Sequence, residues 1–187
     1  MAIRVYIDQG HNPRTPNTGA EGNGLKEQDI TYEVGQRLYA LMVADPNYAV
    51  RLSRPTPDTQ LGSSNAGSLR ARVAGAEAFG ADLFLSIHTN AAQNPQANGS
   101  EAAVYRLGSV AAEIGEDILE EMTALTGLRN RGLIVRPGLY VLRRTSMPAV
   151  LVELGFITNP QDAAAMRDNP DLFARGIYRG LNEYYGF

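Results

Sequence analysis

Short apolar runs alternate with segments of helical periodicity through the first half of this 187-residue chain. Residues 3–8, 48–54 and 83–88 are short, apolar and rich in β-forming side chains, as buried strands are. Residues 25–43 and 68–81, which lie between them, have the pattern of helices. Strands and helices that alternate through short connections favour a parallel sheet with right-handed crossovers. The pattern therefore predicts an α/β fold with a twisted, mostly parallel sheet and helices on both of its faces.

The second half of the chain is expected to complete a three-layer architecture with about six strands. The strand that leads into the tight link Thr-Ser-Met-Pro is expected to run antiparallel. No repeat, low-complexity tract or interdomain linker is found, so residues 1–187 are interpreted as a single domain. The expected strands of this half are 101–107, 138–144 and 149–156, and the expected helices are 109–127, 160–169 and 170–186.

The composition limits the kinds of site that the chain can build. Cysteine is absent, which excludes disulfides and thiolate ligands, so a metal would have to be held by histidine and carboxylate. The net charge of −3 does not favour nucleic acid or an anionic lipid surface as a partner. No apolar stretch reaches the roughly 20 residues needed to span a membrane, and the N-terminus lacks the pattern of a signal peptide. We expect a soluble monomer without membrane insertion, or a domain cut from a longer protein.

Both histidines of the chain stand where a predicted strand ends. His11 follows the first strand, and His88 ends the third. Because ligands gather beyond the carboxyl ends of parallel strands, the two imidazoles are expected at the same edge of the sheet. The alternative interpretation is a pair of unrelated polar residues at strand ends.

Two glutamates interrupt apolar patterns near that edge. At about 100° per residue, Glu27 falls on the same helix stripe as Ile30 and Val34. A glutamate in the first turn is often only a capping or dipole partner, yet an unpaired buried carboxylate costs several kcal/mol. Glu153 lies in the apolar strand AVLVELGF, where an ion pair with an arginine is the alternative explanation.

These four residues suffice for one known type of metal site. Two imidazoles and one carboxylate make a zinc site with an open fourth position for water. A second carboxylate that is not a ligand can act as the general base and acid of zinc-dependent hydrolysis.

Five sequence motifs, distributed over the whole chain, support this interpretation of the four residues. They are IDQGH at 7–11, NTGAEGNGLKE at 17–27, ADLFLSIHTNA at 81–91, RRTSMPAVLVELGFITNP at 143–160 and the closing GIYRGLNEYY. In order and spacing they resemble the zinc-dependent N-acetylmuramoyl-L-alanine amidases, the third amidase family of peptidoglycan hydrolases.

The resemblance implies a function and a role for each residue. His11, Glu27 and His88 would bind Zn²⁺, and Glu153 would be the catalytic carboxylate. The substrate would be peptidoglycan, cleaved at the amide between N-acetylmuramic acid and the L-alanine of the stem peptide. A single catalytic domain acting on the cell wall would then be exported by another route, released by lysis or excised from a larger protein.

Departures from the family pattern concern the surroundings of the site. Asn12 stands where the family commonly has glycine, and Glu77 where many members have asparagine. Members that are held inactive often carry a long inhibitory segment after the SIHTN strand. Here only about ten residues separate this strand from the next one, so an open groove is expected.

Substrate contacts are less defined than the metal ligands. Thr89 and Asn90 follow a predicted ligand and could bind the stem peptide, or they could simply form a turn. Arg129, Arg131 and Arg136 could meet peptide carboxylates, although such a cluster is more often solvated surface.

Three rival functions can be compared with the sequence. The same site could cleave another amide, as a zinc amidohydrolase or peptidase, or the chain could be a wall-binding module without activity. A nucleotide-binding domain would need a glycine-rich turn before the first helix. The candidate turn GAEGNG leads instead to Glu27, which would repel a phosphate.

Overall fold

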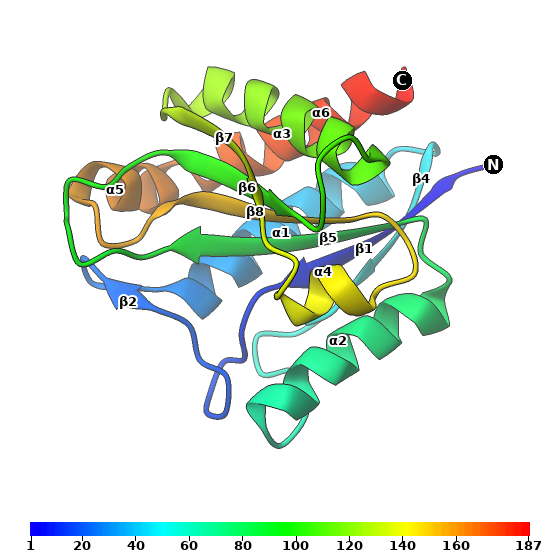
Figure 1. Ribbon diagram of the computed structural model, residues 1–187, viewed down its shortest axis with the longest axis horizontal. Coiled ribbons are helices and arrows are strands. Elements are labelled where there is room, and N and C mark those ends of the chain that lie inside the picture. Colours follow the sequence, from blue (N-terminus) through cyan, green and yellow to red (C-terminus); the bar gives the residue numbers. More distant parts are fainter.

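The computed structural model describes residues 1–187 as one six-stranded sheet with helices on both faces (Figure 1). The strand order is β4-β1-β5-β8-β6-β7. The first four strands run parallel, whereas β6 pairs antiparallel with β8 and parallel with β7. The strands of this sheet are β1 (Ile3–Gln9), β4 (Tyr48–Leu52), β5 (Leu83–Asn90), β6 (Ser100–Val104), β7 (Asn130–Val135) and β8 (Ala149–Phe156).

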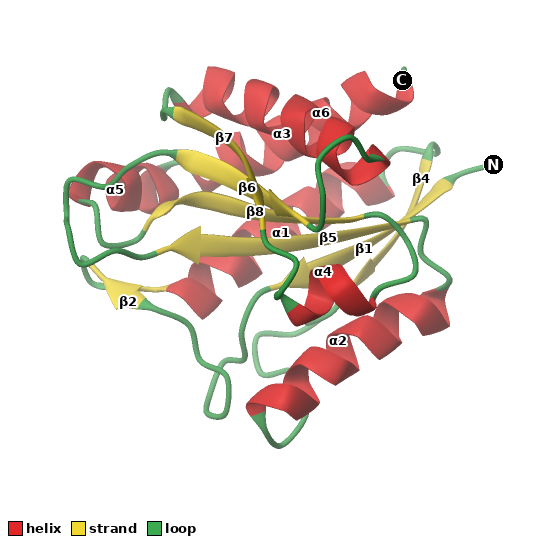
Figure 2. Ribbon diagram, in the orientation of Figure 1, coloured by secondary structure: helices red, strands yellow, loops and turns green.

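The helices form the two outer layers, as expected from the sequence. Helices α1, α3 and α6 cover one face of the sheet, and α2 and α4 cover the other (Figure 2). The chain also contains a small hairpin before α1, made of β2 (Glu21–Gly22) and β3 (Leu25–Lys26). The helices are α1 (Glu27–Val43), α2 (Asn65–Phe79), α3 (Val110–Thr126), α4 (Tyr140–Arg144), α5 (Pro160–Asp168) and α6 (Pro170–Tyr185).

Alternation along the strands divides the core between the two faces of the sheet. Val150 and Val152 of β8 belong to a cluster of 27 buried residues beneath α1, α3 and α6. Ala149 and Leu151 belong to a cluster of 10 buried residues on the side of α2 and α4. Because side chains alternate, Glu153 points to this second, thinner side of the sheet.

One predicted strand is wrong, and one strand of the six-stranded sheet was not predicted; the short hairpin strands β2 and β3 were not predicted either. Residues 138–144 contain the helix α4 and no strand, so the antiparallel pairing expected for them is also wrong. Val141, which favours strands, is buried here beside Leu142 in one helical turn, so packing overrides its propensity. The unpredicted strand of the six-stranded sheet is β7, whose Gly132 has a φ of +78° and interrupts the apolar pattern.

No helix is long and apolar enough to cross a membrane.

Candidate metal and catalytic site

His11, Glu27 and His88 converge at the carboxyl edge of the parallel strands. Their ligand atoms all lie within 4.8 Å of one another. Glu27 Oε2 is 3.2 Å from His11 Nε2, and Glu27 Oε1 is 3.0 Å from His88 Nδ1. A tetrahedral zinc ion with bonds of about 2.0–2.1 Å needs ligand atoms about 3.3 Å apart. The donor set fits a zinc ion, and the two separations between Glu27 and the histidines are close to this value.

The backbone around His11 is fixed by two buried arginines. His11 has a φ of +65°, an uncommon conformation for a residue with a side chain. Its carbonyl oxygen accepts hydrogen bonds from Arg72, at 2.5 Å, and from Arg54, at 3.4 Å. Gly10 leaves the space that the neighbouring imidazole occupies, because a Cβ atom there would lie 2.6 Å from His88 Cε1. The strained loop is thus held where His11 can face Glu27.

Arg72 is itself held by a buried carboxylate. Its Nη1 lies 2.6 Å from Asp8 Oδ1, and Ser86 donates a 2.8 Å hydrogen bond to Asp8 Oδ2. Burial alone would raise the pKa of Asp8, but the charge of Arg72 and its hydrogen bonds hold that pKa below its usual range. The pair anchors the end of β1 to α2.

Glu27 is placed by the start of α1 and by two backbone donors. Ala20 N donates to Oε2 at 2.9 Å, and Thr89 N donates to Oε1 at 3.0 Å. Burial would raise the pKa of Glu27, but hydrogen bonds from the two histidines, together with their charge, lower it. The side chain is therefore a carboxylate, as a metal ligand must be.

Glu153 lies beside this cluster on the neighbouring strand. It stands opposite His88 on one side and opposite Glu101 of β6 on the other. Its Oε2 atom is buried without a hydrogen-bond partner. Burial, followed by the negative charges of Glu27 and Glu101, raises its pKa to about 8, against the opposing charge of Arg136. This carboxyl can exchange a proton near neutral pH.

The two residues that follow His88 have different surroundings. Asn90 donates a 2.7 Å hydrogen bond to Glu101 and lies at the open end of β5. Thr89 is only 5% exposed, and its side-chain oxygen is buried without a hydrogen-bond partner. Thr89 contributes to the site through its backbone N–H, which donates a hydrogen bond to Glu27.

The three arginines predicted to meet peptide carboxylates have different surroundings in the structure. Arg131 makes an ion pair with Glu101, with a 2.8 Å distance between Nε and Oε2. Arg136 lies near enough to Glu153 to oppose the rise in its pKa. Arg129 is exposed and has no side-chain hydrogen bond or ion pair.

Both departures from the family pattern have structural roles. Asn12 is fully buried and joins two loops, because its side chain bonds Pro16 O and both backbone groups of Leu61. Glu77 accepts two hydrogen bonds from Ser146, which tie α2 to the link before β8. Neither side chain reaches the metal cluster.

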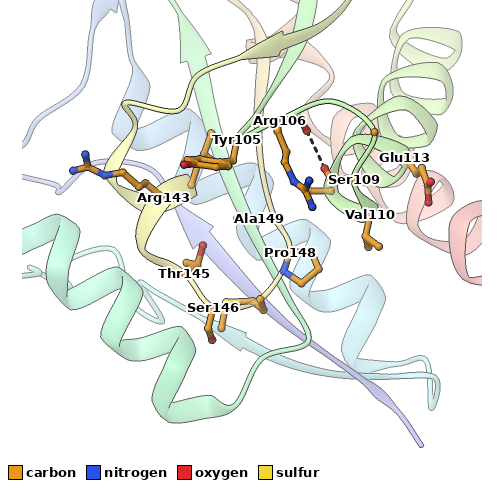
Figure 3. Close-up of a pocket in the computed structure, with 14 residues that line it drawn as sticks. Tyr105, Arg106, Ser109, Val110, Glu113, Arg143, Thr145, Ser146, Pro148 and Ala149 are labelled. Carbon is orange, nitrogen blue, oxygen red and sulfur yellow. Dashed lines mark hydrogen bonds between the residues drawn. The ribbon is translucent and has the colours of Figure 1, made fainter.

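Two cavities lie on the α2 and α4 side of the sheet. A small one of about 120 Å³ is bordered by both histidines and by apolar side chains such as Leu139 and Leu151. A larger one of about 720 Å³ lies at the opposite edge, where Tyr105 and Arg106 face Pro148 (Figure 3). The larger cavity contains none of the four candidate site residues, so the chemistry belongs with the smaller one.

Sequence reasoning missed the residues that support the site. Asp8 in an apolar strand and Arg72 in a helix are charges within buried patterns, the signal that pointed to Glu153. Glu101 stands at the start of a predicted strand, where a charge is ordinary. Only the register of β6 against β8 identifies it.

Comparisons with known proteins agree with this geometry. The profile of the family Amidase_3, described as N-acetylmuramoyl-L-alanine amidase, matches residues 5–183. The N-acetylmuramoyl-L-alanine amidase LytC of Bacillus subtilis (strain 168) is 33% identical over 186 residues, which are 97% of this chain and 35% of LytC. The N-acetylmuramoyl-L-alanine amidase CwlM of Bacillus licheniformis is 34% identical over 183 residues, which are 96% of this chain and 67% of CwlM. The chain thus spans about a third of the length of LytC and about two thirds of that of CwlM.

A solved structure shares the whole fold. The catalytic domain of CwlV, an N-acetylmuramoyl-L-alanine amidase from Bacillus (Paenibacillus) polymyxa var. colistinus, has a TM-score of 0.86 and 30% identity, with 98% of each chain covered. The fold predicted from the sequence is therefore confirmed. The family profile and two relatives above 30% identity each match nearly the whole chain. The chain therefore belongs to the N-acetylmuramoyl-L-alanine amidase family.

Proposed function

We propose that this chain hydrolyses the amide between the lactyl group of N-acetylmuramic acid and the L-alanine that begins the stem peptide of peptidoglycan. The observation that carries the proposal is the convergence of His11, Glu27 and His88 beside Glu153, whose Oε2 atom is buried without a hydrogen-bond partner. The family match and the names of LytC and CwlM support the choice of bond.

His11, Glu27 and His88 would hold one zinc ion. When bound, zinc supplies positive charge that lowers the pKa of a coordinated water toward about 7 and stabilises negative charge on the reacting carbonyl oxygen. The chain holds these ligating residues in place. Two arginines bind the carbonyl oxygen of His11, and two backbone N–H groups donate to Glu27.

Glu153 would move the proton. It takes a proton from the attacking water and delivers it to the alanine nitrogen, because an amine leaves readily only when protonated. The pKa of about 8 means that this carboxyl binds and releases a proton at small cost near neutral pH.

The test of this role is the variant Glu153→Gln. It should retain about one zinc per chain by elemental analysis, because Glu153 is not a ligand, and should lose activity by about 10²–10⁴-fold. Glu77→Gln is the matched control, since Glu77 bonds only Ser146 and should leave turnover unchanged. Near-normal turnover by Glu153→Gln would remove this carboxyl from the mechanism.

Digestion of purified peptidoglycan tests the choice of bond. The proposal predicts intact glycan strands and new amino termini that are only L-alanine. Amino termini of other residues would indicate a peptidase, and the absence of any product would indicate a binding module without activity.

We further propose that residues 1–187 form a single catalytic domain that acts on the cell wall as a monomer. One continuous sheet supports both core clusters, and the family profile spans nearly the whole of it. Sedimentation equilibrium should give a mass near 20.2 kDa.

A further inference from the structure

A row of polar side chains crosses the sheet beside the proposed metal site. His88, Glu153 and Glu101 are opposite one another on β5, β8 and β6. Directly opposed residues point to the same face of a sheet, so all three face the side of α2 and α4. The row leads from the proposed catalytic centre toward the outer strand β7.

An irregularity in β7 adds an arginine to this row. Ser100 pairs with Asn130 and Ala102 pairs with Leu133, so Arg131 and Gly132 together stand against the single residue Glu101. Such a bulge redirects a side chain that regular pairing would place elsewhere, and bulges are common beside active sites. Gly132, with a φ of +78°, permits this backbone path.

The guanidinium group of Arg131 is held from several sides. Nε donates to Glu101 Oε2 at 2.8 Å, and Nη1 donates to Asn98 O at 3.2 Å. The group also lies 5.0 Å from the centroid of the Phe156 ring. Its Nη2 atom has no protein partner, and the side chain is 32% exposed, compared with 7% for Glu101. Arg131 is therefore fixed with donors still directed to solvent.

We propose that Arg131, positioned by Glu101, binds the free carboxylate of the second residue of the stem peptide. This inference rests on the proposed function. That residue is D-glutamate, whose α-carboxylate is free in some peptidoglycans and amidated in others.

The dimensions agree with this assignment. The backbones of β8 and β7 are two strand spacings apart, or about 10 Å. The two residues between the reacting carbonyl and the carboxylate span about 7 Å when extended. The side chain of Arg131 points back toward Glu101 and shortens the remaining distance. A planar guanidinium with free N–H groups is the side chain best suited to a carboxylate.

The alternative is that Arg131 serves only as the counterion of the buried Glu101. The two explanations differ in their dependence on substrate. A counterion affects all substrates equally, whereas a carboxylate-binding residue affects only substrates that carry the carboxylate.

The experiment compares N-acetylmuramoyl-L-alanyl-D-glutamate with N-acetylmuramoyl-L-alanyl-D-isoglutamine, which differ only at that carboxylate. The wild-type chain should have at least a tenfold higher kcat/KM for the first compound. Arg131→Gln should abolish this preference by lowering kcat/KM for the first compound alone. Arg131→Lys should restore part of it, and Arg129→Gln, which removes a neighbouring exposed charge, should leave both values unchanged.

A second variant controls for misfolding. Arg131→Gln leaves Glu101 buried without its counterion, so the double variant with Glu101→Gln removes both charges and should show the same loss of preference. Equal cleavage of both compounds by the wild-type chain, or an equal loss on both in the double variant, would overturn the inference and leave the proposed function intact. Cleavage of neither compound by the wild-type chain, with no binding of either to Glu153→Gln by calorimetry, would overturn both.

Discussion

At the residue scale, the charges that support the site are more deeply buried than those expected to perform its chemistry. Asp8 and Arg72 are 1% and 2% exposed, and Arg72 also bonds the carbonyl oxygen of His11. A buried ion pair adds little net stability compared with apolar packing, but its disruption leaves an uncompensated charge. The pair is therefore better explained by the position of His11 than by stability alone.

Removal of one partner should expose this cost. Asp8→Asn leaves the Arg72 guanidinium buried without its carboxylate and should lower the free energy of unfolding by about 3–5 kcal/mol, measured in urea. Ser86→Ala, which removes one neutral donor to the same carboxylate, should cost about 1 kcal/mol. Equal effects of the two variants would contradict the assignment of a charge-dependent anchor.

The same pair predicts a pH dependence of stability. The folded pKa of Asp8 lies below its unfolded value of about 3.9. Its contribution is therefore complete above that pH and is lost as the pH falls toward the folded pKa. As the pH falls below about 4, urea midpoints of the wild-type chain should therefore fall more steeply than those of Asp8→Asn.

Most residues of the candidate site could be predicted from the sequence one by one. His11, Glu27, His88 and Glu153 stood out because each interrupts or ends an apolar pattern, and the structure brings them together. Glu101 carried no such signal, because its significance comes from a neighbouring strand that is distant in the sequence.

At the scale of elements, helices α3 and α6 of one layer pack closely because of glycines. A Cβ atom at Gly180 of α6 would lie 2.4 Å from Ile118 Cα of α3, and one at Gly176 would lie 2.3 Å from Met122 Cα. These contacts involve backbone, which cannot move aside locally. The glycines therefore set the distance between the helices.

Gly180→Ala should consequently destabilise the chain. Overpacking costs about 1–3 kcal/mol and should exceed the gain of up to about 1 kcal/mol that alanine brings to a helix. Gly138→Ala, at a position with no neighbour within 4 Å, should change stability by less than about 0.5 kcal/mol. A stabilising effect of Gly180→Ala in thermal unfolding would show that the helices can separate without cost.

Element types followed from the sequence wherever periodicity was strong. Five of the six helices are confirmed within a few residues, as are the strands β1, β4, β5, β6 and β8. The failures lie at the two-residue strands β2 and β3, at the five-residue helix α4 and at the bulged strand β7, because these elements are too short or too irregular to produce a period.

At the scale of the whole molecule, folding and metal binding should be linked. The three proposed ligands come from a loop, a helix and a strand, so only the folded chain brings them together. A ligand that binds only the folded state stabilises it by mass action.

Zinc should therefore raise the melting temperature. At 100 times the dissociation constant the stabilisation is about 2.7 kcal/mol, or about 5–10 °C for a chain of this size. His88→Ala should abolish the shift, Glu153→Gln should retain it, and magnesium, which prefers oxygen ligands, should not produce it. An unchanged melting temperature with zinc would contradict the proposed ligand set.

The bulge in β7 also has a consequence for solubility. β7 is the outer strand of the sheet, and an unpaired outer strand offers a template on which other chains can aggregate. The extra residue and the glycine interrupt its ladder of amide groups, so a second copy cannot extend the sheet in register. If the chain acts on peptidoglycan as proposed, many copies would lie close together on this polymer. The bulge would then hinder their aggregation through paired edge strands.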